Sequence, residues 1–137
     1  MSSIRLRAID AWKAEFDGLK PAAVTSYENR LRPLAEEDLD AVNFRWETDV
    51  IVGADSDTRQ REITAFADCA SATESGLDAL IVLVQKAGET DPTLGGLVAE
   101  IAENEVRGSV GELGAEFHMA VVEVVIRYSH TIADPEI

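Results

Sequence analysis

The sequence predicts an α+β fold in which a single mixed, mostly antiparallel sheet of about four to five strands packs against two main helices. Two observations lead to this fold class. Apolar residues recur at helical spacing in two segments, and they alternate with a period of two in several others. In addition, the 137 residues contain no internal repeat, low-complexity segment or obvious linker. We therefore expect one domain spanning residues 1–137.

The first expected helix spans residues 4–19, with Gly18 and Pro21 as its stop signal. Its apolar residues fall on one stripe at helical spacing, which is typical of a helix that covers a core. The stripe comprises Ile4, Ala8, Ala11, Trp12, Phe16 and Leu19.

The second expected helix spans residues 71–89. Ser71 and Glu74 have the spacing of a capping box, and Gly88 is a candidate C-terminal stop. The core stripe of this helix comprises Leu77, Leu80, Ile81 and Val84.

Strands are expected at residues 22–31, 41–52, 59–70, 100–110 and 115–130. In the second of these, period-two alternation predicts an inner and an outer face. The inner face would carry Val42, Phe44, Trp46 and Val50, and the outer face Asn43, Arg45, Glu47 and Asp49. The third strand offers a face of mostly small residues that suits close packing of a helix: Ile63, Ala65, Ala67 and Cys69.

The last strand, "AEFHMAVVEVVIRYSH", has the clearest alternation in the chain. Its apolar face comprises Ala120, Val122, Val124, Ile126 and Tyr128. The opposite face is half apolar, which is more than exposure to water would select, so we expect another surface to cover it. The candidate oligomer-interface residues on that face are Met119, Val121, Val125 and Arg127.

The stretch "ETDPTLGGLV" connects the second helix to the fourth strand. Asp91 and Pro92 start a turn, and the pair Gly95 and Gly96 permits backbone conformations that other residues avoid. A nucleotide loop would need a strand before the glycines and a helix after them. Because the order here is reversed, we interpret these four residues as a structural turn in which at least one glycine has a positive φ.

The chain is acidic, with 26 acidic residues against 12 basic ones and a formal net charge of −14. This balance argues against a nucleic-acid binder, which needs cations to neutralise phosphates. Cys69 is the only cysteine, so an intrachain disulfide and a multi-cysteine zinc site are excluded. Residues 1–16 do not resemble a signal peptide, and no apolar run approaches the roughly 20 residues that span a membrane. We expect a soluble intracellular protein.

The residues that usually carry catalysis are few. The two histidines, His118 and His130, lie 12 positions apart on one strand face, too far to share a site. No serine-hydrolase, zinc-protease, phosphate-loop or dinucleotide motif is present. Acidic pairs such as Glu36 and Glu37 have no surroundings that would desolvate them. We therefore expect a non-enzyme without a cofactor or metal.

The order of these elements resembles the tail terminator proteins of long-tailed phages, the group that includes minor tail protein U and related tail-completion proteins. The resemblance rests on "RLRPL", on "ETDPTLGGLV" after a helix, and on a closing strand, "VVIRYSHTIADP". Tyr128 and Asp134-Pro135 match the end of that strand. The resemblance covers most of the chain but departs over residues 36–58, where "DLDAVNF" replaces a proline before the strand.

The resemblance implies a homo-hexameric ring that sits on the finished tail tube, stops its polymerisation and presents a surface to the head. The implied partners are other copies of the chain, the tail tube protein and the head–tail connector protein. DNA would pass through without specific binding, and no membrane would be involved. The protein would reside in the virion tail after assembly in the host cytoplasm. Acidic loops could line the channel and repel DNA, with Glu36, Glu37, Asp38, Asp55 and Asp57 as the candidates.

Three other readings remain open. One is a different tail or connector part, such as a tube subunit or a head–tail stopper, although two expected helices argue against a tube subunit. Another is an α+β module that dimerises through its sheet and binds a small ligand. The third is an enzyme that acts through carboxylates. Light scattering separates the module from the terminator, because a dimer favours the module and a hexamer or a concentration-dependent ring favours the terminator.

Overall fold

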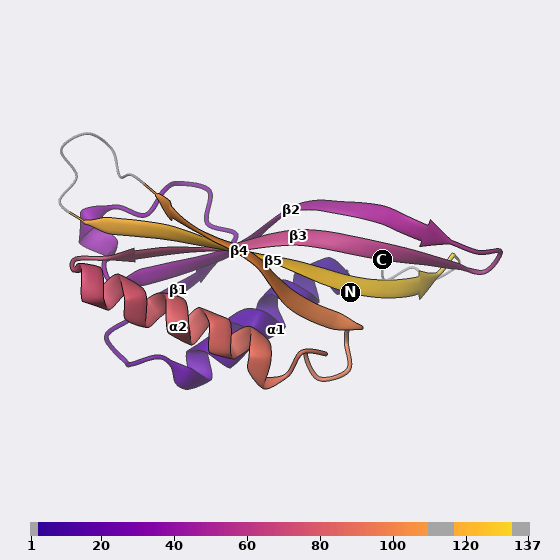
Figure 1. The fold of residues 1–137 in the computed structure, drawn as a ribbon, viewed down its shortest axis with the longest axis horizontal. Helices are drawn as coiled ribbons and strands as arrows, with labels where there is room; N and C mark the ends of the chain where they lie inside the picture. Colours follow the sequence, from indigo (N-terminus) through magenta and orange to yellow (C-terminus); the bar gives the residue numbers. More distant parts are fainter. Residues whose placement is uncertain (1–2, 110–116, 133–137) are drawn as a thin grey trace.

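The computed structural model describes residues 3–109 and 117–132. Within them the chain forms a five-stranded sheet of order β1-β2-β3-β5-β4, with β1 parallel to β2 and the other pairs antiparallel. The elements are α1 (Ile4–Leu19), β1 (Thr25–Glu28), the short 3₁₀ helix η1 (Glu36–Asp38), β2 (Ala41–Ala54), β3 (Thr58–Ser71), α2 (Glu74–Thr90), β4 (Glu100–Ser109) and β5 (His118–Thr131). Figure 1 shows their arrangement, and the predicted α+β class is confirmed.

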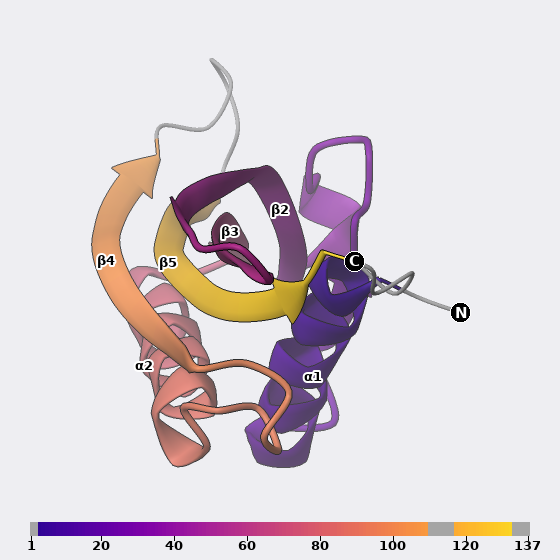
Figure 2. The same ribbon diagram turned by 90° about the vertical axis from the view of Figure 1, so that its right-hand side faces the viewer.

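Both helices pack on one face of the sheet, as the view along the strands shows (Figure 2). Trp12 and Phe16 of α1 contact Phe44 of β2, with ring centroids 4.9 and 5.3 Å apart. The small-residue face of β3 is fully buried, as predicted, because it lies beneath α2. The apolar face of β5 is buried as predicted, too. None of the helices in the described ranges combines the length and the apolar character needed to cross a membrane.

The two helix starts differ in how well the sequence predicted them. Ser3 caps α1 by accepting a hydrogen bond from the Leu6 amide, and α1 covers the predicted 4–19. The predicted capping box at Ser71 is wrong, since Ser71 is the last residue of β3 and is buried. The hydroxyl of Thr73 caps α2 instead, accepting from the Gly76 amide at 3.0 Å.

The predicted ends of several elements also shift. Gly88 is not a stop, because α2 continues to Thr90 and Gly88 lies where the helix passes close to Trp12 and Ile101. Leu19, placed on the α1 stripe, is partly exposed. The first strand is shorter than the predicted 22–31, whereas the last begins at His118. The predicted residues 110, 115 and 116 lie outside the described residues.

Strand β2 contains two irregularities that change which side chains point inward. Its pairing with β3 shifts register between Trp46 and Thr48 and again between Ile51 and Gly53. Because side chains alternate along a strand, one extra residue reverses the faces of the residues that follow it, up to the next shift. Asp49, predicted on the outer face, therefore points inward with its side chain 4% exposed. Val50, predicted inside, is 50% exposed, so both assignments are corrected.

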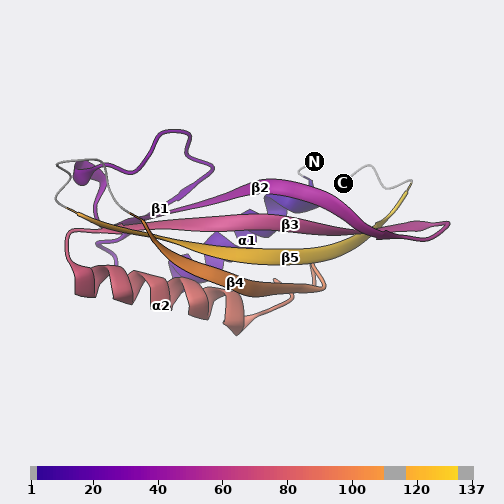
Figure 3. The same cartoon turned by 45° about the horizontal axis from the view of Figure 1, so that its top comes forward.

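Strands β2 and β3 continue past the helices as a long hairpin whose turn forms one end of the molecule (Figure 3). The turn closes where the Asp55 amide donates to the Thr58 carbonyl. β1 pairs with β2 only from Ala41 to Phe44. Over the rest of its length, the outer edge of β2 has no strand neighbour among the described residues.

Candidate interaction surfaces

The face of the sheet opposite the helices is the first candidate surface. On it Val125 of β5 lies beside Thr64 of β3 and Ala102 of β4. These three side chains are small and uncharged, and together they form an uncharged strip between charged flanks. Val121 lies four residues along β5, outside this strip, where its cross-strand neighbours are Asp68 and Arg107. It is half-buried like Val125.

Arg127 marks one flank of this strip. Its guanidinium forms ion pairs with Glu62 of β3, at 3.2 Å, and with Glu100 of β4. These carboxylates raise the pKa of Arg127, chiefly through the hydrogen bond to Glu100. The predicted interface residue Arg127 is thus held within its own sheet, and about half of its side chain stays exposed.

Met119, the fourth predicted interface residue, has a different environment. It packs against a small cluster formed by Leu34, Ala41 and Ala70. The loop that contains Leu34 covers this end of the outer face. A segment of the same chain therefore covers part of the surface that the sequence led us to expect another subunit to cover. For all four residues, the partly buried Met119 included, the assignment to an interface stays a prediction.

The same loop forms a groove that sequence reasoning missed. Asn43 is buried on the outer face, where it accepts from the Arg30 amide and donates to the Arg30 carbonyl. The Asn29 backbone has a φ of 52° and its amide donates to the Phe44 carbonyl. The signal in the sequence was an asparagine inside a strand, which is uncommon and here fixes a loop rather than facing water.

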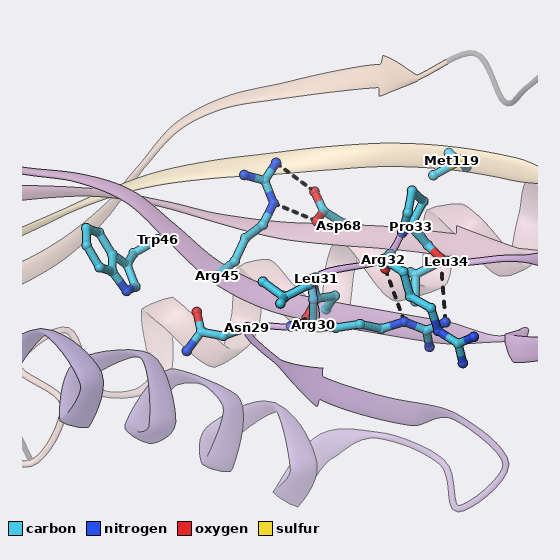
Figure 4. A pocket seen from close by; sticks show the side chains of 11 residues that line it. Asn29, Arg30, Leu31, Arg32, Pro33, Leu34, Arg45, Trp46, Asp68 and Met119 are labelled. Atoms are coloured by element: carbon cyan, nitrogen blue, oxygen red, sulfur yellow. Dashed lines mark hydrogen bonds and ion pairs between the residues drawn. The ribbon is translucent and has the colours of Figure 1, made fainter.

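This groove has a volume of about 460 Å³ and lies between the loop and strands β2 and β3 (Figure 4). Three arginines line it, together with the exposed Leu31 and the half-buried Trp46. Arg45 pairs with Asp68 through two hydrogen bonds of 2.7 and 3.1 Å. The full lining comprises Asn29, Arg30, Leu31, Arg32, Pro33, Leu34, Asn43, Arg45, Trp46, Asp68 and Met119.

The arginines of the groove differ in how firmly they are held. Arg30 pairs with Asp38 at 2.7 Å and stacks over the Tyr27 ring at 4.6 Å. Arg45 lies over the Phe66 ring at 4.5 Å while it pairs with Asp68. Arg32 is exposed and forms no ion pair with the described residues. Arg32 is therefore the groove cation most available to a binding partner.

The hairpin turn at the other end of the molecule combines apolar and acidic residues. Val50, Ile51 and Val52 are each about half exposed, at 50%, 52% and 56%. Asp55 accepts from the amides of Asp57 and Thr58, and these hydrogen bonds lower the pKa of its carboxyl. Asp55 therefore holds the turn together, whereas Asp57 is exposed.

The structure does not bring the predicted channel acids together within one chain. Glu36 and Glu37 are exposed on η1, which lies at the opposite end of the molecule from the hairpin turn with Asp55 and Asp57 (Figure 1). Asp38 is not a free acid, because it accepts from Arg30 and from the Ala35 amide at 2.8 Å. The hydrogen bond from Arg30 is the main reason that the pKa of Asp38 is lowered.

The turn at residues 91–96 has the conformation that the sequence predicted. Gly95 and Gly96 have φ values of 74° and 84°, so the prediction of at least one positive φ is confirmed. The Asp91 carboxylate accepts from the Thr93 hydroxyl at 2.9 Å and from the Gly95 amide at 2.7 Å. Pro92 accepts from the Ile101 amide and so links the turn to β4.

A buried polar cluster connects α1 with three strands. The Asp49 carboxylate accepts from Arg5 of α1 at 3.0 Å and from the Tyr128 hydroxyl at 2.7 Å. Arg61 lies 3.6 Å from its other oxygen and donates to Nε2 of His130 at 2.8 Å. Burial, followed by the hydrogen bond to Asp49, raises the pKa of Tyr128.

The geometry gives this cluster a structural role. Because Nε2 of His130 accepts from Arg61, the proton of a neutral ring lies on Nδ1, which is 2.9 Å from the Thr131 carbonyl. Asp49 is enclosed between the guanidinium groups of Arg5 and Arg61, which fixes the position of its carboxylate. His118 lies at the far end of β5, so the two histidines are not brought together.

Two further features concern chemistry. Burial raises the pKa of the Cys69 thiol to about 12, so it stays protonated at neutral pH. Across residues 3–109 and 117–132, no three histidine, cysteine or acidic side chains gather closely enough to hold a metal ion. No protein-family model and no curated protein matches the chain.

Proposed function

We propose that this protein is a structural subunit of a long-tailed phage or prophage. In this proposal six copies form a ring that caps the tail tube, ends its polymerisation and provides the surface that joins the head–tail connector. The protein acts by covering an interface, without catalysis or a cofactor. It works in the virion tail after assembly in the host cytoplasm, and DNA passes through it without specific binding.

The observation that carries this proposal is the outer face of the sheet. Helices cover only one face, and the other exposes the uncharged strip around Val125. A strip of this kind favours contact with another protein, since water exposure would select polar side chains. The turn at residues 91–96, on which the resemblance largely rests, also has the left-handed glycines that its sequence requires.

The net charge of −14 supports the same proposal in a different way. A ring around a DNA path must not bind the DNA, and like charge opposes binding. The same charge makes six copies repel one another at long range. A ring therefore needs local contacts that overcome this repulsion, and the uncharged strip is one region where a contact meets little repulsion.

The test uses the purified protein with and without its tail tube protein. Negative-stain microscopy and light scattering measure ring formation, and the length of tubes assembled in the presence of the protein measures capping. The variant Val121→Glu/Val125→Glu places one charge on the uncharged strip, at Val125, and one beside it, at Val121, where burial in an interface would oppose association. The control is Val82→Glu on α2, because Val82 is an exposed valine on the helical side.

The proposal expects rings or capped tubes for the wild type and for Val82→Glu, and loss of both for the double variant. A wild type that stays monomeric at high concentration, with and without magnesium, and does not change tube length would overturn it. If the double variant and the control form rings and cap tubes equally well, the outer face does not take part in the contact between copies.

A second candidate is a dimeric module that binds a small ligand. The observation that favours it is the groove beside Trp46, whose volume of about 460 Å³ is typical of small-molecule pockets. A stable dimer in light scattering, together with a thermal shift caused by small anionic compounds, would support this candidate over the ring.

A further inference from the structure

We infer that the hairpin turn of one copy docks into the arginine-lined groove of the next copy, head to tail. We define the hairpin end as Val50–Asp57 and the groove as the lining described above. This inference rests on the proposed ring, because it names the two surfaces through which copies would meet. The first reason for it is the outer edge of β2.

The two edges of the sheet differ in how they are protected. The β4 edge carries Glu103, Glu105 and Arg107 and contains a register shift, both of which discourage strand pairing. The β2 edge beyond Phe44 contains register shifts too, but there it also carries three consecutive half-exposed β-branched residues, Val50–Val52. Proteins rarely leave such an edge open unless another chain covers it.

The second reason is the charge of the groove. Its lining contains three of the chain's 12 basic residues, although the whole chain carries −14. Arg30 and Arg45 are paired with Asp38 and Asp68, which leaves Arg32 as the cation that can attract a partner. The fully exposed Leu31 stands beside Arg32 at its rim. The groove thus offers a cation and an apolar side chain together. A partner segment should then present an acid beside apolar residues.

The hairpin end has this composition. Asp55 and Asp57 follow Val50–Val52 after two small residues, Gly53 and Ala54. Arg59, the nearest cation in sequence, donates to the backbone carbonyls of Asp55 and Thr58. A second copy of the chain is therefore an occupant whose charge and apolar surface both complement the groove.

The positions of the two surfaces determine the kind of assembly. The hairpin end lies at one end of the long axis, and the loop at residues 29–34, which lines the groove, lies toward the other (Figure 1). Two antiparallel copies related by a twofold axis would make both contacts within a closed dimer. In the proposed ring the second contact goes to a third copy instead, so each copy links two neighbours. Head-to-tail contacts of this kind give closed rings or open filaments. The groove also lies next to the outer face of β5, since its lining residue Asp68 pairs with Val121 across the sheet.

The test is disulfide crosslinking between single-cysteine positions at the two surfaces. The variants are Leu31→Cys in the groove and Val52→Cys in the hairpin end. Cys69 is buried and its pKa is raised to about 12, so it does not compete. Under mild oxidation we expect a crosslinked dimer only when the two variants are mixed. The double variant should give a ladder that ends at the closed ring, whereas a ladder that stops at the dimer would show a reciprocal twofold contact and overturn the head-to-tail arrangement.

A charge-exchange pair tests the electrostatic part. Arg32→Glu should weaken association by about five- to tenfold, because an exposed attraction becomes a repulsion. Asp57→Arg should do the same, and the combination of both changes should restore most of the affinity.

Val82→Cys, on the helical side of the chain, is the crosslinking control and should give no specific dimer.

The outcomes separate this inference from the proposed function. Rings that cap tubes but give no Leu31→Cys/Val52→Cys crosslink would overturn the inference and leave the function standing. A mixed-only crosslink without any effect on tube length would support the inference and overturn the function. Homodimers from Val52→Cys alone would show a twofold edge-to-edge contact and would overturn the head-to-tail arrangement.

Discussion

Replacing Asp49 tests whether the register shift in β2 turns this residue inward. The sequence alternation places Asp49 on the surface, where a change to Asn would alter the free energy of unfolding by less than about 0.5 kcal/mol. In the structure, its carboxylate is enclosed by Arg5, Arg61 and Tyr128. The variant Asp49→Asn keeps the size and an acceptor for Tyr128 but removes the charge that faces two guanidinium groups.

The magnitude follows from the burial of these groups. Breaking a fully buried ion pair costs about 3–5 kcal/mol, because a charge is left uncompensated. Arg5 and Arg61 retain side-chain exposures of 29% and 23%, so water screens part of their charge. We therefore expect Asp49→Asn to lower the free energy of unfolding by about 2–3 kcal/mol.

The assay is urea unfolding at pH 7 followed by tryptophan fluorescence. With a slope of about 1–3 kcal/mol/M, the midpoint should fall by about 1–2 M without a change in slope. The matched control is Asp78→Asn on the exposed face of α2, which should leave the midpoint almost unchanged. Equal midpoints for the two variants would refute the inward orientation of Asp49. Tyr128→Phe combined with Asp49→Asn should show non-additive losses, since the two side chains share a hydrogen bond.

Two further predictions concern the glycine turn and the acidic loops. Gly95→Ala and Gly96→Ala should each lower the free energy of unfolding by about 1–2 kcal/mol. The loss should come from positive φ alone, because a Cβ at either position would meet no atom within 4 Å. Thermal unfolding measures it, and the control Gly18→Ala, which is equally uncrowded but helical, should not be destabilised. A loss for Gly18→Ala as large as for the turn glycines would contradict this. The wild type should not bind DNA at moderate salt. Replacing three exposed loop acids by lysine should create DNA binding, and the slope of log K against log salt should steepen by about 0.9 for each phosphate contact. The loop variant changes Glu36, Glu37 and Asp57; the control of equal net charge changes Asp10, Asp78 and Glu89. In a phage assay the loop variant should slow DNA ejection at normal tail length, and equal DNA binding by the control would show that the loops do not line the channel.

The sequence predicted those parts of the fold that depend on local periodicity. The stripe of α1 and the alternation of β3 and β5 each continue without interruption, so each pattern indicates both the element and its buried face. The glycine turn was predictable for a related reason, because few residues other than glycine adopt positive φ easily. In each case the determining interactions lie within a few residues of one another.

The errors arose where a distant partner decides the structure. Nothing within β2 itself marks the shift after Trp46, since the shift is defined only by the pairing with β3. Ser71 and Thr73 are both good capping residues, and the pairing of Ser71 with His118 in the sheet leaves the cap to Thr73. The groove depends on hydrogen bonds between Asn43 and Arg30, which are 13 positions apart. Local patterns carry no information on such contacts.

The same distinction applies to charge. The total of −14 suggests a uniformly repulsive surface and, from the sequence, pointed only to solubility or a DNA channel. Folding gathers Arg30, Arg32 and Arg45 at one groove, while the hairpin end with Asp57 lies at the far end of the molecule. Because exposed charges more than about 8–10 Å apart are largely screened at physiological salt, the local pattern governs contact between copies more than the total does. An acidic chain can therefore keep DNA at a distance and still attract its own copies, provided that the attraction is confined to the groove and the hairpin end.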